Sequence, residues 1–204
     1  MPHEVPVEAL IAVGKLLLDS GLAADYGIAL LHRHFDLRAE HVMVHYSADG
    51  EDICTPRHIR DLDKAALVPC SIFLNRSLNF QPFEYAVGAE RAPLTQQFLS
   101  QLRSLLIARQ LGTMLALATC PHPTIEDGLA VETLLPDLLG MHTALQVGED
   151  HDTSGSRSVV TGWTFDENGS GNIRIHAVKK CVKNAAGVHE VRPETSPESG
   201  NDAA

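Results

Sequence analysis

Two segments carry apolar residues at the spacing of an α-helix. In residues 7–18 the apolar stripe ends shortly before Gly21, which favours a helix stop there. In residues 95–118 the stripe is longer, Thr95 can cap the first turn, and Pro121 follows. Its apolar positions are Phe98, Leu99, Leu102, Leu105, Leu106, Leu111, Met114 and Leu115. The pattern predicts an N-terminal helix and a long central helix at about 95–118 whose stripe forms the core.

Segments rich in β-forming residues lie around these predicted helices. A polar connection separates residues 26–35 from residues 41–46, and we interpret the pair as a β-hairpin. A dense run of turn formers with an Asn-Gly pair separates residues 158–165 from residues 172–178, which predicts a second hairpin. Prolines and glycines interrupt residues 49–91, so short strands and irregular loops are expected there.

These elements favour the α+β class. The strands do not alternate regularly with helices, and no internal repeat is visible, so a mainly antiparallel sheet built from hairpins and packed on the central helix is expected. Residues 1–191 are expected to form a single globular α+β domain. Residues 192–204 have no apolar residue large enough to anchor them, which predicts a disordered acidic tail.

The charge balance disfavours nucleic acid as a partner. Of the 204 residues, 16 are Lys or Arg and 26 are Asp or Glu, which gives a formal net charge of −10. Binding to phosphates needs a basic surface. The basic residues near the C-terminus have no aromatic residues between them, and we interpret them as a solvated face; they are Arg174, Lys179, Lys180 and Lys183.

The N-terminal residues and the cysteines predict a soluble, cytoplasmic protein that has no membrane partner. The first residues lack the charged and apolar regions of a signal peptide, and no apolar run approaches the length of a membrane span. The cysteines form no CxxC pair and are expected to be free thiols; they are Cys54, Cys70, Cys120 and Cys181. The sequence leaves the oligomeric state open.

Several motifs are absent, which removes support for whole classes of enzyme. The chain contains no GxxxxGK[ST] loop, no GxGxxG after a strand, no GxSxG elbow and no HExxH. Nucleotide hydrolysis, dinucleotide binding, α/β-hydrolase chemistry and zincin proteolysis therefore lose support.

The histidines of the first predicted hairpin are the main candidates for chemistry. His32 and His34 are two residues apart, so on a strand both imidazoles project from the same face. In the following segment His41 and His45 share one face, and the hairpin would place His41 nearly opposite His34. Imidazoles that converge in this way suit Zn²⁺, non-haem iron or copper with a position open for water. We predict His32, His34, His41 and His45 as metal ligands.

Two nearby glutamates are the candidate catalytic residues. Glu40 and Glu51 could act as a base or as a fourth ligand, with Asp52 close by. The predicted function is a small metal-binding protein, with Zn or non-haem Fe, in which a histidine cluster could support lyase, hydrolase or oxygenase chemistry on a small organic molecule. Gly27, the His-x-His pair and Glu40 resemble the start of the first cupin motif, but their spacings differ from it and no second motif follows.

Two alternatives stay open at this level. The chain could be a non-catalytic protein-binding or assembly module with structural histidines, because Ile28 and Leu30 share a strand face with His32 and His34. It could also be a thiol enzyme, with His122 lowering the pKa of Cys120, although a proline-rich helix stop explains the same residues. Whether the protein is an enzyme is therefore undecided from the sequence.

Overall fold

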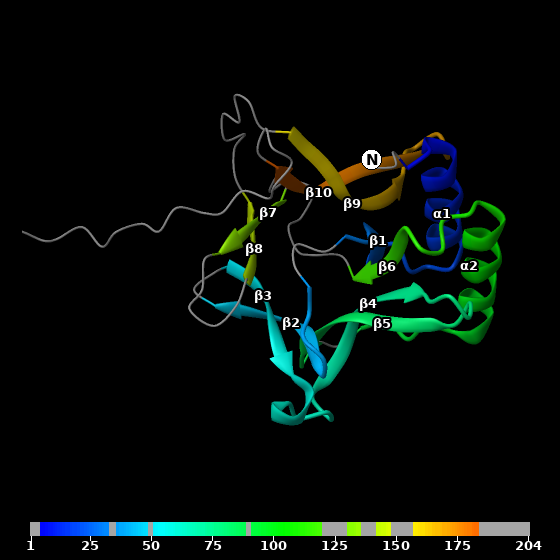
Figure 1. The fold of residues 1–204 in the computed structure, drawn as a ribbon. Helices are drawn as coiled ribbons and strands as arrows, with labels where there is room; N and C mark the ends of the chain where they lie inside the picture. The colour runs from blue at the N-terminus through cyan, green and yellow to red at the C-terminus, as the bar shows by residue number, and fades with distance from the viewer. Residues whose placement is uncertain are drawn as a thin grey trace, which may run out of the picture.

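The protein is a closed β-barrel with two helices on its outside (Figure 1). The computed structural model describes residues 5–32, 36–48, 51–88, 91–119, 130–135, 142–147 and 157–183. The strands are β1 Tyr26–Leu30, β2 His41–Ala48, β3 Glu51–His58, β4 Leu67–Leu74, β5 Phe80–Val87, β6 Leu115–Thr119, β7 Ala130–Leu135, β8 His142–Val147, β9 Arg157–Glu167 and β10 Ile173–Lys183. They close in the order β1-β6-β4-β5-β2-β3-β8-β7-β10-β9, and β9 pairs with β1.

The barrel is a mixed sheet, so the predicted α+β fold on a long central helix is wrong. Neighbouring described strands are antiparallel except β2 with β5 and β7 with β10, which are parallel. The described helices are α1 Val7–Asp19, α2 Gln96–Ala108 and the short 3-10 helix Ile59–Asp61. Closing the sheet leaves no central place for a helix, because side chains of the strands themselves project into the interior.

The N-terminal helix is confirmed, whereas the long helix ends ten residues earlier than predicted. The Thr95 hydroxyl caps α2 by accepting from the Phe98 N–H at 3.1 Å. Gln110 then has a φ of 57°, which stops the helix, and the chain turns into β6. The apolar stripe continues past this turn because β6 is itself largely buried. The sequence pattern of α2 and β6 therefore resembles that of one long helix.

The two helices lie side by side against the outer face of the barrel (Figure 1). Leu17 of α1 and Leu102 and Leu106 of α2 are fully buried, and they belong to the same core as Ile28 of β1 and Leu117 of β6. The apolar core is therefore the layer between the helices and the sheet, which leaves the barrel interior available for other residues.

The second predicted hairpin is confirmed and the first is wrong. β9 and β10 pair antiparallel over their length. β1 instead pairs with β6 and β9, and β2 pairs with β3 and β5. The region expected to hold short strands and loops contains three strands of eight residues each, β3, β4 and β5. Pro69 and Pro82 fit there because the β4–β5 ladder shifts register between residues 69 and 72.

The structure contains an internal repeat that the sequence does not show. A helix followed by five strands, α1 with β1–β5, is followed by α2 with β6–β10. The pairs β2–β3, β4–β5 and parallel β2–β5 correspond to β7–β8, β9–β10 and parallel β7–β10. Equivalent strands join the halves through β1–β6 and β3–β8, and β4–β6 has its counterpart in β9–β1. Self-pairing of equivalent elements is the mark of a twofold relation.

Two local motifs also occur in both halves. A residue with positive φ follows each helix, Gly21 at 67° and Gln110 at 57°. The Asn75 and Asn168 side chains each accept from backbone N–H groups two and four residues later, in the turns that join β4 to β5 and β9 to β10. Both turns read Asn-x-Ser-x-Asn. The repeat therefore lies in backbone pairing and turn chemistry, with few identical side chains to reveal it.

Two further expectations concern membranes and the tail. The described residues contain no helix that is long and apolar enough to cross a membrane. The predicted tail, residues 192–204, lies outside the described residues.

Candidate functional site

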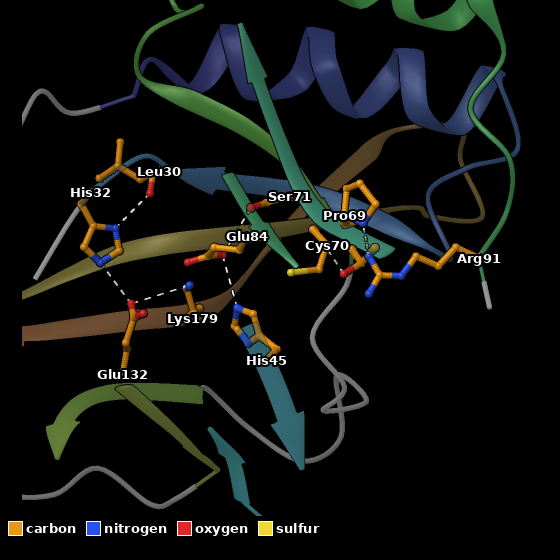
Figure 2. A network of polar contacts seen from close by, with 11 residues as sticks. Leu30, His32, His45, Pro69, Cys70, Ser71, Glu84, Arg91, Glu132 and Lys179 are labelled. Carbon is orange, nitrogen blue, oxygen red and sulfur yellow. Dashed lines mark hydrogen bonds and ion pairs between the residues drawn. The ribbon is translucent and has the colours of Figure 1, made fainter. Parts of the chain in front are cut away.

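A cluster of charged side chains occupies the interior of the barrel (Figure 2). We call it the lumen cluster, and its members are His32, His45, Glu84, Glu132 and Lys179. They come from β2, β5, β7, β10 and the residues after β1. Charged groups removed from water are tolerated only when they are paired or bind an ion.

Glu132 holds one arm of the cluster together. The His32 Nε2 lies 3.0 Å from the Glu132 Oε2, and the Lys179 Nζ lies 3.6 Å from the same oxygen. The other ring nitrogen of His32, Nδ1, lies 2.9 Å from the Leu30 carbonyl oxygen. Side-chain exposure is only 8% for Glu132 and 13% for Lys179. This arm is a buried ion-pair network.

Both basic groups of this arm are protonated at neutral pH. Burial alone would lower the pKa of His32, but hydrogen bonds with Cys181 and Glu132 outweigh it and raise that pKa to about 10. Burial also works against the Lys179 ammonium, yet the carboxylates of Glu132 and Glu84 raise its pKa above the usual value. The arm therefore carries two positive charges around one carboxylate.

The second arm joins His45 to Glu84. The His45 Nε2 lies 3.3 Å from the Glu84 Oε2, and the Ser71 hydroxyl donates to the same carboxylate oxygen at 3.3 Å. The parallel pairing of β2 with β5 brings these side chains together, and the register shift in β4 brings Cys70 beside them. Cys54 lies directly opposite His45 on β3.

Burial and mutual pairing shift the pKa values of this arm in opposite directions. Burial lowers the pKa of His45, but hydrogen bonds with Cys54, Cys70 and Glu84 raise it well above its ordinary value. Burial would raise the pKa of Glu84, yet His45 lowers it overall. Burial raises the pKa of the Cys54 thiol to about 11. With no bound ion, this arm is an imidazolium–carboxylate pair beside the protonated Cys54 thiol.

Two sets of side chains have metal-ligating atoms within 4.8 Å of one another. One set is His45, Cys70 and Glu84, and the other is His32, Glu132 and Cys181. Each offers one nitrogen, one sulfur and one oxygen atom, a combination that Zn²⁺ accepts.

The twofold relation places the two arms at equivalent positions in the barrel. Met43 pairs with Glu84 as Ala130 pairs with Lys179, so Glu84 and Lys179 are equivalent. His45 and Glu132, two residues further along their strands, are then equivalent as well. The second half thus has an ammonium group where the first half has a carboxylate.

A cavity of about 250 Å³ adjoins the cluster. Ala29 lines it and pairs with Ala116 on one side and Gly162 on the other, so three small residues face the lumen in a row. A Cβ at Gly162 would lie 2.9 Å from the Lys179 Cβ. The polar lining includes Ser71, His32, Glu84, Glu132 and Lys179, and the apolar lining includes Leu37, Val42, Met43, Phe73 and Phe83.

The structure places three of the four histidines predicted as ligands, and it gives them different surroundings. His32 and His45 belong to the lumen cluster, but to separate sets of donors. His41 lines the cavity, its Nδ1 lies 2.9 Å from the Ala39 carbonyl oxygen, and its ring lies edge-on to His58 at 5.1 Å. His34 lies outside the described residues.

The predicted catalytic and thiol residues lie elsewhere or are not described. Glu40 lies on the exposed surface, where its carboxylate pairs with His58 at 3.2 Å and Arg60 at 3.4 Å. Glu51 is the first residue of β3, and its side chain is outside the description, as are Cys120 and His122.

Sequence reasoning missed most of the lumen cluster. Glu84 and Glu132 are lone carboxylates inside apolar strand segments. A charge in such a strand needs a partner, so this pattern could have identified them as members of a buried polar cluster. Lys179 was interpreted as part of a solvated face, yet it points into the barrel, as Figure 2 shows. Nothing local distinguishes it from Lys180.

Comparison with known proteins adds no family assignment. No protein family, no curated protein and no solved structure matches this chain. The geometry therefore has to define the class: a closed mixed barrel with metal-ligating groups and a cavity in its interior.

Proposed function

We propose that this protein binds one transition-metal ion, preferably Zn²⁺, through His45, Cys70 and Glu84. We also propose that it takes a small organic molecule into the adjoining cavity. One observation carries the proposal. Three donor atoms from three different strands, β2, β4 and β5, lie within 4.8 Å of one another in the barrel interior. Imidazole, thiolate and carboxylate are all established zinc ligands.

The donor set is suited to the exchange of protons for a metal ion. His45 must lose its proton to ligate, and the Cys70 thiol must become a thiolate. The ion would replace the positive charge that His45 holds beside Glu84 at 3.3 Å. In the other set the Lys179 ammonium, 3.6 Å from Glu132, already supplies that charge, which favours the His45 set.

The cavity supports a role in small-molecule chemistry. Glu84 lines the cavity, so an ion bound to it would face the space where a ligand sits. Three protein ligands leave a fourth position for water, whose pKa a zinc ion lowers to about 7. This chemistry suits hydrolase or lyase reactions, whereas oxygenase chemistry would need iron in the same place.

The test is metal content together with the spectrum of the cobalt-substituted protein. Untagged protein is loaded with Zn²⁺ or Co²⁺, dialysed, and analysed by inductively coupled plasma mass spectrometry and by absorption spectroscopy. We expect one ion per chain and a thiolate-to-cobalt charge-transfer band. Cys70→Ser should lose both, whereas the matched variant Cys181→Ser, a buried thiol of the other set, should keep both.

Two outcomes would contradict the proposal. Retention of the band in Cys70→Ser with its loss in Cys181→Ser would assign the ion to the His32 set. Failure of the folded wild type to bind Zn²⁺, Co²⁺ or Fe²⁺ would make the lumen cluster an ion-pair network, and would favour the alternative of a non-catalytic module.

A further inference from the structure

The cavity is lined by both charged and apolar side chains. Among the charged side chains, Lys179 and His32 both contact one carboxylate oxygen of Glu132. An ammonium has three donors, and this contact uses one of them. The two ring nitrogens of His32 already contact Glu132 and the Leu30 carbonyl oxygen, whereas the Lys179 ammonium has further donors for a ligand.

Aromatic and sulfur-containing side chains contribute to the apolar lining of the cavity. Phe73 and Phe83 line the cavity and contact each other edge to face at 5.8 Å, and Met43 lines the same space. The volume, about 250 Å³, corresponds to roughly eight water molecules at about 30 Å³ each. The space therefore fits a small molecule with one polar end.

We propose that the cavity binds a small organic monoanion, with its carboxylate on Lys179 and its apolar body against Phe73, Phe83 and Met43. The inference deepens the proposed function by assigning the class of ligand that enters the same cavity, and it does not depend on the metal ion. The twofold relation supports different roles for the two halves of the barrel. Where the first half has the Glu84 carboxylate of the proposed metal site, the second half has the Lys179 ammonium, a fixed cation, at the equivalent position.

The test uses benzoate as the probe and benzamide as its neutral counterpart, with calorimetric titration of chelator-treated and Zn²⁺-loaded protein. We expect benzoate to bind the metal-free protein and benzamide to bind at least about tenfold more weakly, because a hydrogen bond to a charged group is lost. Lys179→Met should weaken benzoate binding by a similar factor. Lys180→Met is the matched control, because strand alternation places its side chain on the opposite face.

A second variant keeps the test decisive if Lys179→Met does not fold. Ala116→Val leaves all charges in place and adds two methyl groups to the cavity wall, where Ala116 pairs with Ala29. It should abolish benzoate binding while the protein still binds metal.

Each remaining outcome separates this inference from the proposed function. Equal binding of benzoate and benzamide, or unchanged binding in Lys179→Met, overturns the inference. Benzoate binding that needs Zn²⁺ and does not depend on Lys179 also overturns it, because the anion would then be a metal ligand, while metal binding stands. Lys179-dependent binding in a protein that never takes up metal supports the inference and contradicts the proposed function.

Discussion

Raising the pH through the neutral range should lower the unfolding free energy of this protein, because the His32 imidazolium loses its proton. Its imidazolium lies 3.0 Å from the Glu132 carboxylate and 2.9 Å from the Leu30 carbonyl oxygen, and its pKa in the folded protein is about 10. In the unfolded chain the pKa returns to 6.5. Because the folded value is the higher one, the stabilisation is complete below about pH 6.5 and is lost as the pH rises towards 10.

The magnitude follows from the two pKa values. Between them, each pH unit is worth about 1.4 kcal/mol of unfolding free energy. A rise from about pH 7 to about pH 9 should therefore remove about 3 kcal/mol. This is a large share of the unfolding free energy of a folded domain, which is typically about 5–15 kcal/mol.

The assay is urea unfolding of metal-free wild type and His32→Gln across this pH range. Groups remote from His32 contribute equally to both proteins, so the difference between the two curves reports His32 together with its contact to Glu132. The wild type should lose its advantage over His32→Gln as the pH rises. Parallel curves, or a His32 imidazole that titrates near pH 6.5 by NMR, would refute the assignment of a buried imidazolium paired with Glu132.

Two further predictions concern the barrel itself. Gly27→Ala would place a Cβ 2.3 Å from the Trp163 carbonyl oxygen, and should lower the unfolding free energy by about 1–3 kcal/mol, whereas Gly169→Ala, with nothing within 4 Å, should change it by less than about 0.5 kcal/mol in urea unfolding. A chain cut between residues 88 and 91 should yield two fragments that co-purify as a one-to-one complex, because β1–β6 and β3–β8 join the halves; a fragment that is a stable monomer by light scattering would contradict this.

Elements that depend on short-range signals could be predicted from the sequence. The N-terminal helix follows from its own periodicity, and the β9–β10 hairpin follows from the turn formers between its strands. The central helix could not be bounded correctly, because the turn at Gln110 interrupts a stripe that the buried strand β6 then continues. The first hairpin was wrong because β1 finds its partners on β6 and β9, far along the chain.

The candidate site could likewise be predicted from the sequence only in part. The sequence drew attention to His32 and His45, since histidines in apolar strands need an explanation. It could not show that they belong to separate arms, or that their partners are Glu132, 100 residues away from His32, and Glu84. Those pairs depend on parallel strand pairing and on register shifts at β4 and β10.

By itself, the sequence determined which residues could form a helix, a tight turn or a strand, because those preferences depend on neighbours within a few positions. Only the tertiary structure decided that the sheet closes, that two halves repeat, and that Lys179 points inward while Lys180 does not. The physical reason is that strand side chains alternate, so one step of register moves a charge from solvent to the lumen. Long-range pairing sets that register, and with it the chemistry of the barrel interior.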